Sequence, residues 1–229
     1  MRFCRKTSAR ALNIVDQQRV KRKMSKLPAV DSRQIIQIAA AGMLVPMWVW
    51  FGYRHVLAFA STGEWSYLFL CISETLTVGF LLVRTYPKSV SKIPLDWIVA
   101  IVGTFSTLLF LPASWGILPS AKYAIAAGTL LQIFAMLSLN RSFAIVAARR
   151  EIKTEGMYRF VRHPLYASYL LTYSGYLAAN TSFENAMIYL FAIGCMLLRI
   201  LREENHLCID EAYAAYMQRV RYRIIPFVF

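Results

Sequence analysis

The chain has 229 residues, of which 58% are hydrophobic, and it combines a net charge of +14 with a mean hydropathy of +0.45. This composition is too apolar for a soluble domain of its size and indicates an integral membrane protein. The positive charge does not indicate nucleic-acid binding, because the Lys and Arg residues are spread over four separate segments, as membrane insertion requires.

Residues 1–33 form a basic segment that contains the run RVKRK at 19–23. The segment has no apolar stretch of its own, so it is not expected to be a cleavable signal peptide. We predict a basic N-terminal tail that faces anionic lipid, followed by one membrane domain over residues 34–229.

Six apolar stretches follow, and each has few or no charged residues. We predict that they cross the membrane as helices, at about 20 residues per crossing. The last stretch is short, so its helix should continue through Arg199, Arg202, Glu203 and Glu204. Pro46 and Pro112 lie inside predicted spans, where proline marks a kink. The predicted spans are 34–53, 65–83, 97–115, 123–140, 164–183 and 185–198.

Charge also predicts the orientation. Of the 26 Lys and Arg residues, all but Arg54 and Lys122 fall in segments 1–33, 84–96, 141–163 and 199–229, which alternate with the other loops. Because Lys and Arg are retained on the cytoplasmic side, we expect a multi-pass protein with both termini in the cytoplasm. Residues 207–220 are amphipathic and predict a C-terminal interfacial helix. The expected fold class is therefore all-α, an integral membrane helical bundle of about six transmembrane helices with a C-terminal interfacial helix.

Polar residues inside the spans are few. Glu74 lies at the centre of the second span, where a carboxyl group is either functional, or protonated or paired with a hydroxyl of a neighbouring helix. Cysteine and histidine are too sparse to indicate a disulfide framework or a metal site. The ten glycines are too widely spaced for a Rossmann turn or a P-loop.

Charged and aromatic residues gather in the last third of the chain. The segment RFVRHPLYASY places Arg159, Arg162 and His163 directly before an apolar run, and Glu203 and Glu204 follow the last one. The basic residues anchor the end of a spanning helix, hold an anionic ligand, or do both. A pocket built from these segments and covered by the C-terminal helix would hold both signs of charge, which suits a zwitterionic cofactor.

Three ordered blocks, GMYRFVRHPLYASY, LREENHL and YAAYMQRVRYRIIP, resemble the C-terminal half of the isoprenylcysteine carboxyl methyltransferase and phospholipid methyltransferase superfamily. These membrane enzymes use S-adenosylmethionine (SAM) without a Rossmann fold. The resemblance covers about residues 140–229 and implies that the SAM site lies there. The implied cofactor-binding residues are Tyr158, His163, Pro164, Tyr166, Glu203 and Glu204, and the implied catalytic residues are Arg162, His163 and Arg223. The chain departs from the common pattern at Met157 and Ser168, where proline and glycine are usual.

The resemblance implies methyl transfer from SAM to a lipophilic acceptor at the cytoplasmic membrane face, with no nucleic acid and no obligate protein partner. The acceptor stays open. A carboxylate would need a cation, for which Arg162, His163 or Arg223 would serve, whereas an amine or phenol would need a base such as His163. RHPLY and the ending YRIIPFVF also resemble sterol reductases that use NADPH, and a third hypothesis is a non-catalytic membrane binding module.

Overall fold

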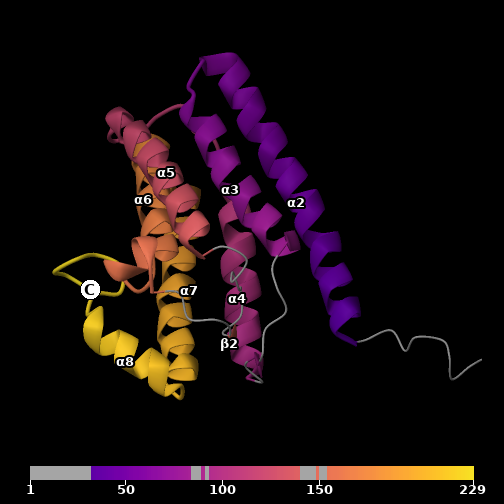
Figure 1. The fold of residues 1–229 in the computed structure, drawn as a ribbon. Helices are drawn as coiled ribbons and strands as arrows, with labels where there is room; N and C mark the ends of the chain where they lie inside the picture. The colour runs from indigo at the N-terminus through magenta and orange to yellow at the C-terminus, as the bar shows by residue number, and fades with distance from the viewer. Residues whose placement is uncertain (1–31, 84–88, 91–92, 140–147, 150–153) are drawn as a thin grey trace, which may run out of the picture. The chain divides into compact units, whose positions relative to one another are not determined.

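The structure is a computed structural model that describes residues 32–83, 89–90, 93–139, 148–149 and 154–229 (Figure 1). The chain divides into two compact units, residues 1–43 and 44–229. Of the first unit only the initial turns of one helix are described, so the predicted basic tail lies almost entirely outside the described residues. All further contacts belong to the second unit.

The described part is helical, which confirms the predicted all-α class. Its α-helices are α2 Ser32–Thr62, α3 Ser66–Val83, α4 Pro94–Ser106, α5 Lys122–Leu139, α6 Pro164–Ala179, α7 Phe183–Leu207 and α8 Glu211–Arg219. Short 3-10 helices are η1 Thr107–Leu109, η2 Pro119–Ala121 and η4 Gly156–Arg159. The exception is a two-residue antiparallel pair, β1 Ser89–Val90 with β2 Ala148–Arg149.

Within the described residues, two helical stretches are long and apolar enough to cross a membrane, Pro119–Leu139 and Phe183–Leu207. Ser66–Gly79 and Pro94–Leu109 are apolar but shorter. The six predicted crossings and their orientation therefore stay predictions. The expected continuation of the last span is confirmed, since α7 runs without interruption from Phe183 through the charged residues to Leu207.

The prediction of a kinked helix over 97–115 is wrong. α4 ends at Ser106, η1 ends at Leu109, and the chain around Pro112 is irregular. Proline has no N–H and disfavours helical backbone at the residue before it, so the helix stops ahead of it. Asn185 satisfies the exposed backbone there, because its Oδ1 accepts from the N–H of Leu111 at 2.9 Å and its Nδ2 donates to the carbonyl of Leu111 at 2.8 Å.

The core of the second unit lies between α3, α5 and α6. α5 and α6 run side by side (Figure 1), and a Cβ at Gly128 of α5 would overlap the hydroxyl of Thr172 on α6. Glycine therefore allows the two backbones to approach closely. Ile125 of α5 and Tyr176 of α6 are fully buried and belong to this core.

Glu74 of α3 is buried in this core, with 3% of its surface exposed. Its Oε1 accepts from the Tyr173 hydroxyl at 2.9 Å, and its Oε2 accepts from the Thr107 hydroxyl at 3.3 Å. This arrangement confirms the reading in which Glu74 is paired with hydroxyls of neighbouring elements. Two donors offset part of the cost of burying a carboxyl group.

The C-terminal helix expected within 207–220 is present as α8. The Asp210 side chain caps it by accepting from the N–H of Ala212 at 3.0 Å. Tyr213, Tyr216 and Val220 form a small buried cluster on one side of α8. The amphipathic helix is therefore confirmed, and its location at the membrane interface stays a prediction.

Candidate functional site

The candidate site begins where the chain enters α6. Pro164 is the first helical residue, where its missing N–H costs no helical hydrogen bond. The N–H groups of Arg162 and His163 donate to the carbonyls of Tyr222 and Arg223, at 2.9 and 2.8 Å. These bonds fix the segment that precedes α6 against the segment that follows α8.

Glu204 lies at the centre of the site, on the last turns of α7. Its Oε1 accepts from Arg162 Nε at 2.7 Å and is 3.1 Å from His163 Nε2. Its Oε2 accepts from Arg223 Nε at 2.8 Å. The Nη1 of Arg162 also donates to the backbone carbonyls of residues 220–221. We call this set, Glu204 with Arg162, His163 and Arg223, the Glu204 clamp.

The clamp is largely withdrawn from solvent. Glu204 is 3% exposed, Arg162 8% and His163 6%, whereas the side chain of Arg223 is 31% exposed. An unpaired charge at such a position would be strongly destabilising, but here two guanidinium groups match one carboxylate. The clamp therefore joins α6, α7 and the C-terminal segment, and it has an excess of positive charge.

A second polar group lies one residue earlier on α7. Tyr166 donates its hydroxyl to Glu203 Oε2 at 3.2 Å, and its ring lies 5.5 Å from the ring of His163. The guanidinium of Arg199 lies over the Tyr166 ring, 5.4 Å from its centroid, and Arg199 Nη1 donates to Thr104 Oγ1 at 3.4 Å. Glu203 and Arg199 are only partly buried, so this group borders the more exposed side of the site.

Tyr158 approaches the site from η4. Its side chain is buried, and its carbonyl accepts a 2.6 Å hydrogen bond from the hydroxyl of Tyr216. Burial, reinforced by the negative charge of Glu203, raises the pKa of Tyr158 well above its usual range. Burial likewise raises the pKa of Tyr216 to about 12. Both phenols are therefore neutral near pH 7, and the hydroxyl of Tyr216 acts as a hydrogen-bond donor.

The sequence-predicted residues thus come together from four segments. Arg162, His163, Glu204 and Arg223 are in direct contact, and Tyr166 contacts Glu203. Pro164 sets the start of α6 and Tyr158 lies on the adjacent turn. Their roles toward a cofactor or acceptor stay predictions.

Two interactions were missed in the sequence. The sequence placed Arg199 only on the continuation of the last span, and not as a cation over the ring of Tyr166. Arg202 Nε lies 3.6 Å from Oδ1 of Asp96, a buried carboxylate in the first turn of α4. The sequence did contain a signal for the position of Asp96, because an acidic residue just after Pro94 is typical of the first turn of a helix. It contained no signal for the contact with Arg202.

Among the described residues, two apolar helical stretches are long enough to cross a membrane, and one of them, α7, ends in the buried charged clamp. This combination is typical of a helical membrane protein with a polar site. Residues 116–215 match the family model described as phospholipid methyltransferase. The match covers 100 of the 229 residues and confirms the predicted resemblance to the superfamily of membrane methyltransferases that includes the phospholipid and isoprenylcysteine carboxyl methyltransferases. The matched range contains Tyr158 to Glu204 and ends before Arg223. No curated protein and no solved structure matches the chain.

Proposed function

We propose that the protein transfers a methyl group from SAM to a lipophilic acceptor, the carboxylate or headgroup of a lipid or isoprenoid-like molecule, at the cytoplasmic membrane face. The family match implies a methyltransferase, and methyltransferases of this family generally use SAM. The observation that carries the proposal is that two adjacent glutamates, Glu203 and Glu204, have different hydrogen-bond partners. Both oxygens of Glu204 are occupied by the chain's own cations, whereas Glu203 has an oxygen to spare.

The chemistry of the residues present fits SAM. Glu203 is partly buried, and within the described residues its Oε1 forms no hydrogen bond, so it could accept from an ammonium or a ribose hydroxyl. The rings of His163, Tyr166 and Tyr158 supply aromatic faces, which attract cations. The cofactor-binding set would be these three side chains with Pro164, Glu203 and Glu204, the last acting through the clamp.

The chain's part in the reaction is to orient two reactants and exclude water. When bound, SAM supplies an electrophilic methyl group on a sulfonium. Holding the two reactants in line for displacement lowers the activation barrier by on the order of 7–11 kcal/mol. No covalent nucleophile is needed. Burial of the Glu204 clamp fixes the helix ends that would form the site.

The clamp atoms that remain available suit two classes of acceptor. Arg223 is the most exposed clamp cation, and beyond its Nε it has two further nitrogens that could hold a carboxylate acceptor. His163 directs Nε2 to Glu204; if that nitrogen carries the proton, Nδ1 is the atom that would accept a proton from an amine acceptor. Arg162 already directs its Nε to Glu204 and its Nη1 to two carbonyls, so it would act chiefly by holding the clamp.

The test is a titration of the detergent-purified protein with S-adenosylhomocysteine, with NADPH in parallel, followed by the midpoint of thermal unfolding. A ligand that binds only the folded state raises the midpoint. We expect S-adenosylhomocysteine alone to do so. Stabilisation by NADPH alone would replace the proposal with the reductase hypothesis, and no response to either would favour the non-catalytic binding module.

A matched pair of variants tests the site itself. Glu203→Gln removes the candidate cofactor carboxylate, and we expect it to abolish most of the S-adenosylhomocysteine response. Glu184→Gln makes the same change at an exposed position at the other end of α7 and should leave the response intact. An unchanged response in Glu203→Gln would contradict the assignment of Glu203.

A further inference from the structure

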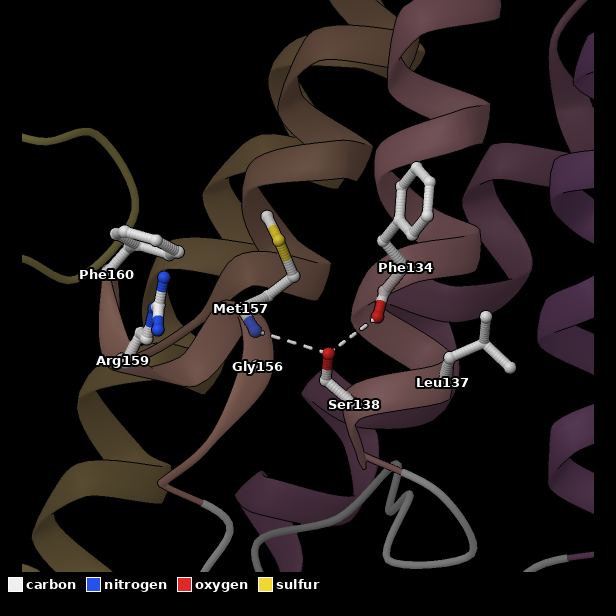
Figure 2. Close-up of a pocket in the computed structure, with 7 residues that line it drawn as sticks. All are labelled: Phe134, Leu137, Ser138, Gly156, Met157, Arg159 and Phe160. Carbon is white, nitrogen blue, oxygen red and sulfur yellow. Dashed lines mark hydrogen bonds between the residues drawn. The ribbon is translucent and has the colours of Figure 1, made fainter.

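A groove outside the candidate site lies between the C-terminal end of α5 and η4 (Figure 2). Its volume is about 450 Å³, and α5 contributes Phe134 and Leu137 to its wall. Met157, Arg159 and Phe160 form the opposite side. The groove is thus mostly apolar and contains one cationic side chain.

The apolar walls are uncovered by the described residues. Phe134, Leu137 and Phe160 are 57%, 69% and 54% exposed. Two of them lie near the end of Pro119–Leu139, a stretch long and apolar enough to span a membrane. Exposed apolar side chains of this kind favour contact with hydrocarbon over contact with water.

Arg159 supplies the charge. Its side chain is exposed, and its guanidinium lies over the ring of Phe160, 4.6 Å from the centroid. No carboxylate of the described residues lies within ion-pair distance of Arg159. A cation that is stacked on a ring at the end of an apolar helix lies where lipid phosphates are found.

The two walls are held at a fixed separation, so the groove is formed before any ligand binds. The N–H of Met157 donates to Ser138 Oγ at 3.2 Å, and Ser138 Oγ donates to the carbonyl of Phe134 at 2.8 Å (Figure 2). Gly156 has a φ of +60°, and a Cβ there would meet Ser138 Oγ. A preformed groove loses less conformational entropy on binding than a flexible surface does.

We propose that this groove binds an anionic membrane phospholipid, with its phosphate on Arg159 and an acyl chain along Phe134 and Leu137. The charge of Arg159 selects an anionic headgroup, and the apolar wall matches a hydrocarbon chain. The groove is distinct from the candidate cofactor site, because none of the residues of that site lines it, and Tyr158, between Met157 and Arg159, is buried. The proposal does not depend on the proposed methyl transfer.

The experiment uses the full chain in detergent and follows the thermal midpoint during titration with phosphatidylglycerol or with phosphatidylcholine of identical acyl chains. We expect half-saturation at about fivefold lower concentration for phosphatidylglycerol, the contribution of one Arg at an anionic headgroup. Arg159→Gln should abolish this preference, and Arg159→Lys should retain most of it. The control is Arg219→Gln, which removes another exposed guanidinium that lies over a ring, that of Tyr216, and should keep the preference.

Equal responses of the wild type to the two lipids would overturn the proposal, as would a preference that survives in Arg159→Gln. Leu137→Asn tests the acyl half, because it should weaken both lipids alike. Unchanged affinity for both lipids in Leu137→Asn would exclude this wall as the acyl site. Both side chains are exposed, so these variants should fold.

Discussion

Glu204→Gln removes the negative charge of the clamp and keeps the size of the side chain. The carboxylate receives three contacts, from Arg162 Nε at 2.7 Å, His163 Nε2 at 3.1 Å and Arg223 Nε at 2.8 Å. Glutamine offers one oxygen, so its NH₂ must face a guanidinium on the other side. Breaking a buried pair by removing one partner costs about 3–5 kcal/mol, because the remaining charge stays buried. Arg162, at 8% exposure, is that charge.

The assay is thermal unfolding of the detergent-purified protein without ligand. A loss of about 3–5 kcal/mol corresponds to a fall of about 6–20 °C in the unfolding midpoint for a chain of this size. Glu203→Gln is the matched variant one residue away. It lies at a less buried position and should lose no more than about 1 kcal/mol. If Glu204→Gln has the unfolding midpoint of the wild type but loses S-adenosylhomocysteine binding, Glu204 is a direct ligand and its structural role in the clamp is refuted.

Further predictions concern the helix contact and alkaline pH. Gly128→Ala should destabilise the protein by about 1–3 kcal/mol or more, since its Cβ would overlap Thr172, whereas Gly194→Ala has open space and should be neutral or stabilising; equal unfolding midpoints would contradict this contact. The pKa of Tyr216 is about 12 in the folded protein and 10 when exposed, so its contribution to stability is complete below pH 10 and is lost as the pH rises to about 12. Unfolding midpoints measured across this range should fall less steeply in Tyr216→Phe, and an identical slope would show that another group titrates.

The fold class was predictable because its signals are local. Apolar length and the scarcity of charge indicate helices, and the short last stretch correctly implied that α7 continues through Arg199 to Glu204. The end of α4 was predicted too late, because its apolar run continues beyond the point where Pro112 stops the helix. Hydropathy alone does not register that backbone constraint.

The candidate site was predictable as a set of residues and only partly as an arrangement. The sequence placed Arg162, His163, Glu203 and Glu204 near each other, but two adjacent glutamates look alike in a sequence. Their helical positions separate them, and only the packing of α6 and the C-terminal segment decides that Glu204 meets the cations. Such long-range pairing has no local signature in a single sequence.

The backbone bonds from Arg162 and His163 to Tyr222 and Arg223 also set an order of events during synthesis. A ribosome that has translated α6 and α7 has made Glu203, Glu204 and Tyr166, yet the donors of Arg162 still lack the carbonyls of residues 220–221. Until residues 220–221 are made, the guanidinium of Arg162 has incomplete partners. Completion of the site therefore requires residues 220–223, and a chain truncated before them would leave Nη1 of Arg162 without both of its carbonyl acceptors.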